Sequence, residues 1–256
     1  MIIIGCPVYK RGWILPAWFY FIENQSVDLS DIGFIFELGT DDQETIDILL
    51  SWKSRHPEVE IFDLEVRDDL AHFAHQEGTR QWTYAKYENM ISMRNSILDK
   101  VRKIQPEAYF SLDSDVLLTN PNTIELLLGH LKMGADAVNT LMFMTPFGTD
   151  FPSVMTWIEN TNYERAERRQ PYPLGGYFKS DVIMAAKMMS KNVYNNVDYR
   201  FHVQGEDLGW SAGCAEKGYE LYCASYIYTP HIMGQAEMKE FLASGDPRQA
   251  VTYQSI

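Results

Sequence analysis

The sequence contains little cysteine and no excess of positive charge. Among its 256 residues there are three cysteines, Cys6, Cys214 and Cys223, and no two of them form a Cys-x-x-Cys pair. An odd number of scattered cysteines argues against a disulfide framework or a zinc knuckle, so we expect buried thiols in a cytoplasmic protein. Lysine and arginine total 22 against 35 acidic residues, which gives a net charge of −13. Such a charge disfavours general nucleic-acid binding.

Long apolar runs are also missing. The N-terminal stretch 2–4 is too short for the apolar region of a signal peptide, and no basic segment precedes it. Segment 12–22 is rich in aromatic residues, but Pro16 and Glu23 keep it below membrane-spanning length. We therefore expect no transmembrane segment. Hydrophobic residues still make up 46% of the chain, which is enough for a large globular core.

Apolar runs alternate with helical patterns along the chain, which predicts an α/β fold with a mostly parallel sheet flanked by helices. Strands are expected at residues 2–5, 33–38, 59–66, 108–112, 135–143, 176–179 and 219–228. Helices are expected at 15–24, 41–54, 87–103, 121–131, 181–190 and 205–217, with Asn120 and Pro121 starting the fourth. Segment 145–173 is expected to be an irregular binding loop or lid.

Asp113 and Asp115 follow the expected strand 108–112 directly. In open α/β sheets, ligands bind outside the carboxyl ends of the strands. Carboxylates at that place suit Mg²⁺ or Mn²⁺, and such an ion can hold the diphosphate of a nucleotide. An acidic turn that caps the next segment explains an isolated Asp-x-Asp equally well.

Glu206 and Asp207 lie in the first turn of the expected helix 205–217, where the helix dipole by itself favours acids. The functional alternative is a carboxylate general base that accepts the proton of an attacking hydroxyl. His231 follows the last expected strand. A histidine there is more often structural, but together with an Asp-x-Asp it becomes a candidate nitrogen ligand for the same ion.

The two pairs of acids and His231 follow one another in the order found in glycosyltransferases of the GT-A fold, and the chain resembles these enzymes, particularly family 2. The start of the chain, 2–11, fits that pattern. Residues 37–42 (Glu-Leu-Gly-Thr-Asp-Asp) stand where family 2 carries Asp-Asp-Gly-Ser-Thr-Asp, and 93–95 (Met-Arg-Asn) where it carries Ala-Arg-Asn. The second half is similar to the mannan polymerase subunits of fungi through segments 173–182 and 205–207.

The resemblance implies a metal-dependent transfer of sugar from a UDP- or GDP-sugar to an acceptor hydroxyl, with Mn²⁺ or Mg²⁺ as cofactor. It implies that Asp115 and His231 bind the metal, that Asp113 binds metal or ribose, and that Asp207 or, as second choice, Glu206 is the base. The other donor-binding residues that it implies are Pro7, Tyr9, Arg11, Glu37, Arg94, Ser114, Gly175 and Gly176.

The same resemblance implies a single GT-A domain over 1–256. Its nucleotide-sugar-binding half is 1–118, its acceptor and catalytic half is 119–234, and 235–256 is expected to be a mobile tail. The chain departs from family 2 at Leu38, where an acid is usual, and Asp41 and Asp42 are also explained as helix caps. It lacks the Gln-x-x-Arg-Trp signature of processive synthases, so a processive enzyme is not expected.

Two other function classes stay open. A sugar-1-phosphate nucleotidyltransferase normally has a glycine-rich loop after its first strand, and segment 5–12 has few glycines. A non-catalytic sugar-binding module would not need the full set of acids and histidine. The stereochemistry of transfer is open, and so is the acceptor, which could be a glycan, a protein, a small metabolite or a hydroxylated base in DNA.

Two further clusters carry weaker signals. His72 and His75 near Glu77 are expected to be solvated loop residues, because His-x-x-His with no further ligand is a poor metal site. The basic cluster 165–169 is expected to be a solvated helix face whose arginines pair with nearby glutamates. A contact for an anionic acceptor is the alternative.

Overall fold

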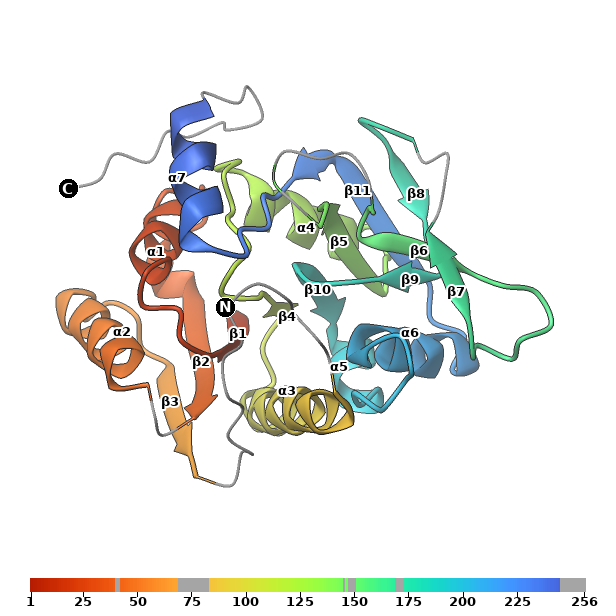
Figure 1. Cartoon of the computed structure of the whole chain (residues 1–256), viewed down its shortest axis with the longest axis horizontal. Coiled ribbons are helices and arrows are strands. Elements are labelled where there is room, and N and C mark those ends of the chain that lie inside the picture. Colours follow the sequence, from red (N-terminus) through yellow and green to blue (C-terminus); the bar gives the residue numbers. More distant parts are fainter. Residues whose placement is uncertain (40–41, 69–82, 145, 147–150, 169–172, 245–256) are drawn as a thin grey trace.

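A central sheet organises the fold (Figure 1). The computed structural model describes residues 1–39, 42–68, 83–144, 146, 151–168 and 173–244, and within them this sheet has eight strands. β10 and β8 run antiparallel to their neighbours, and the other neighbouring pairs are parallel. The mostly parallel, mixed α/β sheet expected from the sequence is confirmed. In sheet order the strands are β3 (Phe62–Arg67), β2 (Ile32–Gly39), β1 (Ile2–Val8), β4 (Ala108–Ser111), β10 (Lys187–Ser190), β5 (Ala137–Leu141), β11 (Leu221–Tyr228) and β8 (Tyr177–Lys179).

Helices cover both faces of the sheet (Figure 1). Ile2 and Ile4 of β1 belong to the core on one face and Ile3 to the core on the other, because side chains alternate along a strand. A strand covered on both faces is apolar at nearly every position, as β1 is. One face is covered by α1 (Leu15–Glu23), α2 (Gln43–Arg55), α4 (Thr123–Lys132) and α7 (Gln235–Ser244), and the other by α3 (Tyr84–Ile104), α5 (Lys191–Asn196) and α6 (Glu206–Glu216).

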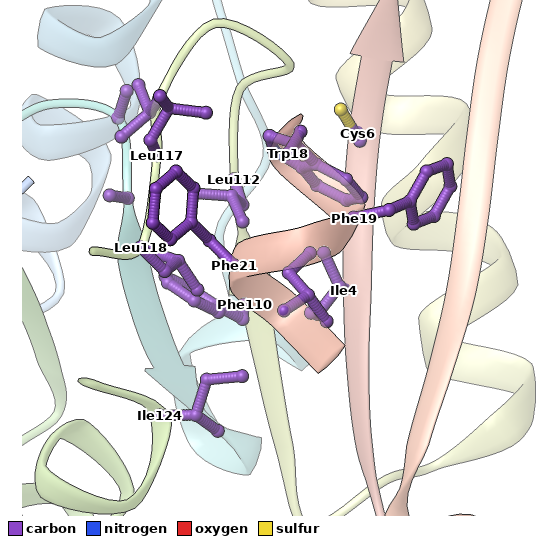
Figure 2. Packing of buried hydrophobic residues seen from close by; sticks show 14 of the residues in the cluster. Ile4, Cys6, Trp18, Phe19, Phe21, Phe110, Leu112, Leu117, Leu118 and Ile124 are labelled. Carbon is purple, nitrogen blue, oxygen red and sulfur yellow. The ribbon is translucent and has the colours of Figure 1, made fainter. Parts of the chain in front are cut away.

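Aromatic side chains of α1 fix this helix against the sheet (Figure 2). Phe19 stacks on Trp52 of α2, with ring centroids 4.1 Å apart and planes within 11°. Trp18 and Phe21 belong to the same cluster as Phe110 of β4. Burying each large apolar side chain contributes about 1.5–3 kcal/mol, so α1 is held firmly beside the strand ends at which the acids follow.

A second, antiparallel sheet lies where the sequence predicted a loop at 145–173 and the start of a helix at 181–190. β6 (Val154–Trp157) pairs with β7 (Ala166–Arg168) and with β9 (Val182–Ile183). The expectation of an irregular segment 145–173 is therefore wrong for residues 154–157 and 166–168, which are strands. The expected helix 181–190 is also wrong, since this segment forms β9 and β10. A short apolar run fits a helix and a buried strand equally well, and here pairing with β4 and β5 decides for strand.

Several smaller expectations also need correction. α4 begins at Thr123, so Pro121 is not its first residue. In the described part of the basic cluster, Arg165 directly precedes β7 and Arg168 lies on it, so neither is on a helix, and Arg169 lies outside the described residues. Arg168 donates a hydrogen bond to the carbonyl of Pro152. Residues 235–244 are not a mobile tail, because they form α7 and bury Met238 among other core residues. The expected loop histidines at 72 and 75, with residue 77, lie outside the described residues, as do Asp41 and 245–256.

Other expectations are confirmed. The side chain of Asp42 accepts a hydrogen bond from the backbone of Thr45 and caps α2. Cys6, Cys214 and Cys223 are buried free thiols. Across the described residues, none of the helices is both long enough and apolar enough to cross a membrane. A short 3₁₀ helix, Leu29–Asp31, leads into β2.

Candidate active site

The polar residues gather where the strand order of the sheet reverses. β1 lies between β2 and β4, and in open α/β sheets such a reversal is the usual place of ligand binding. Arg11 follows the carboxyl end of β1, and Asp113 and Asp115 follow that of β4. Nη2 of Arg11 lies 2.8 Å from Oδ2 of Asp115. The indole Nε1 of Trp18 donates to the carbonyl of Asp113 at 3.2 Å, so α1 also holds this turn.

Backbone pairing brings His231 to the same place. Val116 and His231 form an isolated antiparallel bridge, and the N–H of Ile232 donates to the carbonyl of Asp115 at 2.8 Å. The chain that leaves β11 therefore crosses back over the end of β4. As a result, Nε2 of His231 lies 3.5 Å from Oδ1 of Asp115, and both side chains are buried. The expected meeting of Asp115 with His231 is thus present in the structure.

These two side chains fit a divalent cation as two of its ligands. Adjacent ligands of an ion bound at about 2.1 Å are about 3 Å apart, which is close to the 3.5 Å between the two donor atoms. Oδ1 of Asp113 is turned to Arg94 at 2.8 Å, and binding of the metal or the ribose by Asp113 stays a prediction. Within the described residues, no three His, Cys, Asp or Glu side chains are grouped to hold a metal. An ion here would take its remaining ligands from a diphosphate and water, as Mg²⁺ commonly does.

Arg94 is buried and connects the end of β4 to α6. Its Nη2 lies 2.8 Å from Oδ1 of Asp113, its Nη1 donates to Oγ of Ser111 at 3.0 Å, and its Nε lies 3.3 Å from Oε1 of Glu206. Burial opposes the charge of Arg94, but Asp113, Asp207 and Glu206 outweigh burial and raise its pKa well above the usual value. The guanidinium therefore stays charged and holds two carboxylates in place.

Glu206 and Asp207, the two expected candidates for the base, meet different cations. Asp207 accepts a hydrogen bond from Nζ of Lys187 on β10. Burial opposes the ionisation of Asp207, yet Lys187 and Arg94 hold its pKa below the usual value. Burial and then the neighbouring Asp207 raise the pKa of Glu206, although Arg94 opposes them. Glu206 is therefore the stronger base of the pair, and either assignment stays a prediction.

Lys187 is the polar residue of this cluster that sequence reasoning missed. The expected helix 181–190 would have placed it on a helix, whereas it lies fully buried on β10. The usable signal was a lone lysine within the apolar stretch 182–189, because lysine is almost never fully buried unless it is paired. A buried strand with one lysine therefore requires an acid on a neighbouring element.

Glu37, which was expected to bind the donor, is buried below the protein surface. It is fully buried in β2, with Oε2 3.3 Å from Nη1 of Arg67 and Oε1 3.9 Å from Nζ of Lys100. Burial raises the pKa of Glu37. Pro7 lies beside it on β1, and Tyr9 follows that strand with 37% of its surface exposed. Contact of these residues with a donor stays a prediction.

Gly175 and Gly176 lie elsewhere, beside the outer strand β8. Gly175 has a φ of +70°, which favours glycine, and the N–H of Gly176 donates to Oγ of Ser225 at 3.0 Å. Ser114 is buried between the two aspartates. Gly176 also accepts a hydrogen bond from the backbone of Ser225, and the role of the two glycines toward a donor sugar stays a prediction.

Comparison with known proteins gives a consistent result. Residues 1–167 match the family model described as glycosyltransferase family 25, N-terminal domain. The chain is 26% identical over 204 residues to a glycosyltransferase 25 family member of Aedes aegypti, which covers 78% of this chain and 33% of that protein. It is 37% identical over 60 residues to procollagen galactosyltransferase 1-A of Xenopus laevis, or 23% of this chain and 10% of that protein. The chain thus spans a third or less of these relatives.

A solved structure supports the fold. A mannosyltransferase from Pyrobaculum calidifontis, in complex with GDP-Man and Mn²⁺, superposes with a TM-score of 0.60 at 11% identity. The match covers 95% of this chain and 63% of that one. At so low an identity the similarity establishes the GT-A fold alone.

Proposed function

This chain belongs to glycosyltransferase family 25, and on that premise we propose that it transfers a sugar from a nucleoside-diphosphate donor to an acceptor hydroxyl. Family 25 replaces the expected family 2, and the resemblance to fungal mannan polymerase subunits stays a prediction. The observation that carries the proposal is the approach of Asp115 to His231 at the carboxyl end of β4, next to Arg11.

In the proposed mechanism, Asp115 and His231 would hold a Mn²⁺ or Mg²⁺ ion, which would offset the charge that develops on the departing nucleoside diphosphate. Arg11 orients the carboxylate of Asp115 through their 2.8 Å contact. Glu206 or Asp207 accepts the proton of the acceptor hydroxyl, whose oxygen then bonds to the anomeric carbon as the bond to the diphosphate breaks. A single displacement of this kind inverts the anomeric centre, and the configuration of the product tests this step.

The comparisons suggest which donors to test first. The Xenopus relative is named for galactosyl transfer to procollagen, and the archaeal neighbour holds GDP-Man. We therefore propose UDP-galactose and GDP-mannose as first donors, with a glycan or a protein hydroxyl as acceptor. The net charge of −13 makes a hydroxylated base in DNA the weaker acceptor candidate.

The proposal is tested by thermal unfolding with a panel of UDP- and GDP-sugars, each with and without Mn²⁺. A donor at about 100 times its Kd stabilises the folded state by about 2.7 kcal/mol, and we expect this only when the metal is present. Asp115→Asn should abolish that metal-dependent stabilisation while the protein stays folded. Asp99→Asn, on the exposed side of α3, is the matched control and should behave as the wild type.

Two other outcomes would replace the proposal. Pyrophosphate release from a sugar 1-phosphate and a nucleoside triphosphate would identify a nucleotidyltransferase. Donor binding with neither transfer nor donor hydrolysis would identify a binding module. Equal metal-dependent stabilisation of the wild type and Asp115→Asn would reject the proposed ion site.

A further inference from the structure

Two buried cations face the acidic start of α6. The side chains of Arg94 and Lys187 are 1% and 0% exposed. Arg94 lies against Glu206 and Asp113, and Lys187 lies against Asp207. Two cations thus serve three carboxylates, and Asp207 is influenced by both of them.

Lys187 reaches this cluster from the middle of the sheet. β10 is the antiparallel strand between β4 and β5, and Lys187 pairs in register with Ser111 and Asn139 on those strands. Its Nζ lies 5.0 Å from the ring centre of Tyr199 and 4.8 Å from that of Trp210. Two aromatic rings therefore flank the ammonium, and Asp207 is the carboxylate that it contacts.

We infer that Lys187 is a positioning residue for the transfer reaction, which holds Asp207 as a partly buried anion and so fixes the first turn of α6. The inference rests on the proposed function. Stability alone does not explain this pair, because apolar residues of similar volume usually replace a buried ion pair at no cost. If the reaction requires the carboxylate of Asp207 in the first turn of α6, that requirement explains why β10 carries Lys187.

The charged groups around Asp207 predict how its pKa changes when Lys187 is removed. The groups that face it are Lys187 from β10, Arg94 from α3, Tyr199 from the segment before α6, and Glu206 on its own helix. Without Lys187, one cation serves three carboxylates, and the pKa of Asp207 rises, because Lys187 is the nearest cation that lowers it. With Asp207 as the base, which must be ionised to act, the acid limb of the kcat profile then moves to higher pH.

Two experiments test the inference. Urea unfolding compares Lys187→Met, Asp207→Asn and the double variant. Steady-state kinetics with the donor as the varied substrate compares kcat and KM of Lys187→Met with those of the wild type. Lys187→Met should lower the unfolding midpoint, and the double variant should recover part of the loss, since the two residues are coupled. At neutral pH, kcat of Lys187→Met should fall roughly tenfold with donor KM within about twofold, and its acid limb should move up by about one pH unit. Lys132→Met removes an exposed ion pair with Glu107 and should change none of these values.

Each outcome decides the inference. A folded Lys187→Met variant with wild-type kcat and an unshifted acid limb would overturn it, and so would additive effects in unfolding. If Lys187→Met does not fold, recovery of folding in the double variant supports the pair, and no recovery refutes it. A wild-type protein that turns over no donor rejects the proposed function, whereas equal turnover by wild type and Lys187→Met rejects the role of Lys187 alone.

Discussion

Replacing Arg94 with methionine should destabilise the protein strongly, and more at high pH than at low pH. Removing one partner of a buried ion pair costs about 3–5 kcal/mol, because it leaves the other charge buried. The side chain of Asp113 is 26% exposed and can be solvated by water, whereas that of Glu206 is 10% exposed. Most of the cost therefore falls on Glu206, and we expect a loss of about 3 kcal/mol near neutral pH.

The pH dependence follows from the direction of the pKa shift. The pKa of Glu206 is already raised by burial in the folded protein, and loss of Arg94 raises it further. Below the unfolded pKa of about 4.3, Glu206 is protonated in both states and its part of the cost is small. As the pH rises through the pKa that Glu206 has in the folded variant, its carboxyl group must ionise without the cation of Arg94, so the folded state loses stability.

Urea unfolding followed by tryptophan fluorescence, at about pH 5.5 and about pH 8, measures this difference. Arg55→Met, at an exposed position near the end of α2, is the matched control and should change stability by no more than about 0.5 kcal/mol. An Arg94→Met variant that loses less than about 1 kcal/mol, or loses the same amount at both pH values, would refute the ion-pair reasoning.

Two further predictions concern packing and helix capping. A Cβ at Gly209 would lie 2.0 Å from a backbone oxygen, whereas one at Gly129 would meet nothing within 4 Å. Gly209→Ala should therefore destabilise the folded protein by about 3 kcal/mol, whereas Gly129→Ala should stabilise α4 by about 1 kcal/mol. Equal melting temperatures of the two variants would contradict this packing. Asp42→Ala removes the cap that accepts from Thr45 and should cost about 1 kcal/mol in urea unfolding; an unchanged midpoint would show that the cap is dispensable.

The sequence predicted the parallel part of the sheet well because its signals there are local. β1 and β2 are continuous apolar runs, which is the pattern of strands covered on both faces. α3 shows apolar residues at helical spacing, and its buried side chains include Met93, Ile97 and Val101. Segment 181–190 was instead expected to be a helix, and that expectation is wrong because the strand character of β10 depends on β4 and β5 as partners.

The candidate site was predicted less completely. The sequence indicated the acids after β4 and His231 as ligands of one ion, and the acids at the start of α6 as candidates for the base. It did not predict that Asp113 faces Arg94 or that Glu37 is buried under Arg67. These facts depend on side-chain directions at the ends of several strands, which periodicity does not specify.

By itself, the sequence determined the fold class and the order in which acids follow the strands, since both depend on patterns within a few residues. The tertiary structure alone decided how side chains from distant segments come together. His231 reaches Asp115 because the chain after β11 crosses the end of β4, and Lys187 reaches Asp207 because β10 inserts between β4 and β5. Both meetings join segments that are distant in sequence, and only the packing of the whole sheet brings them together.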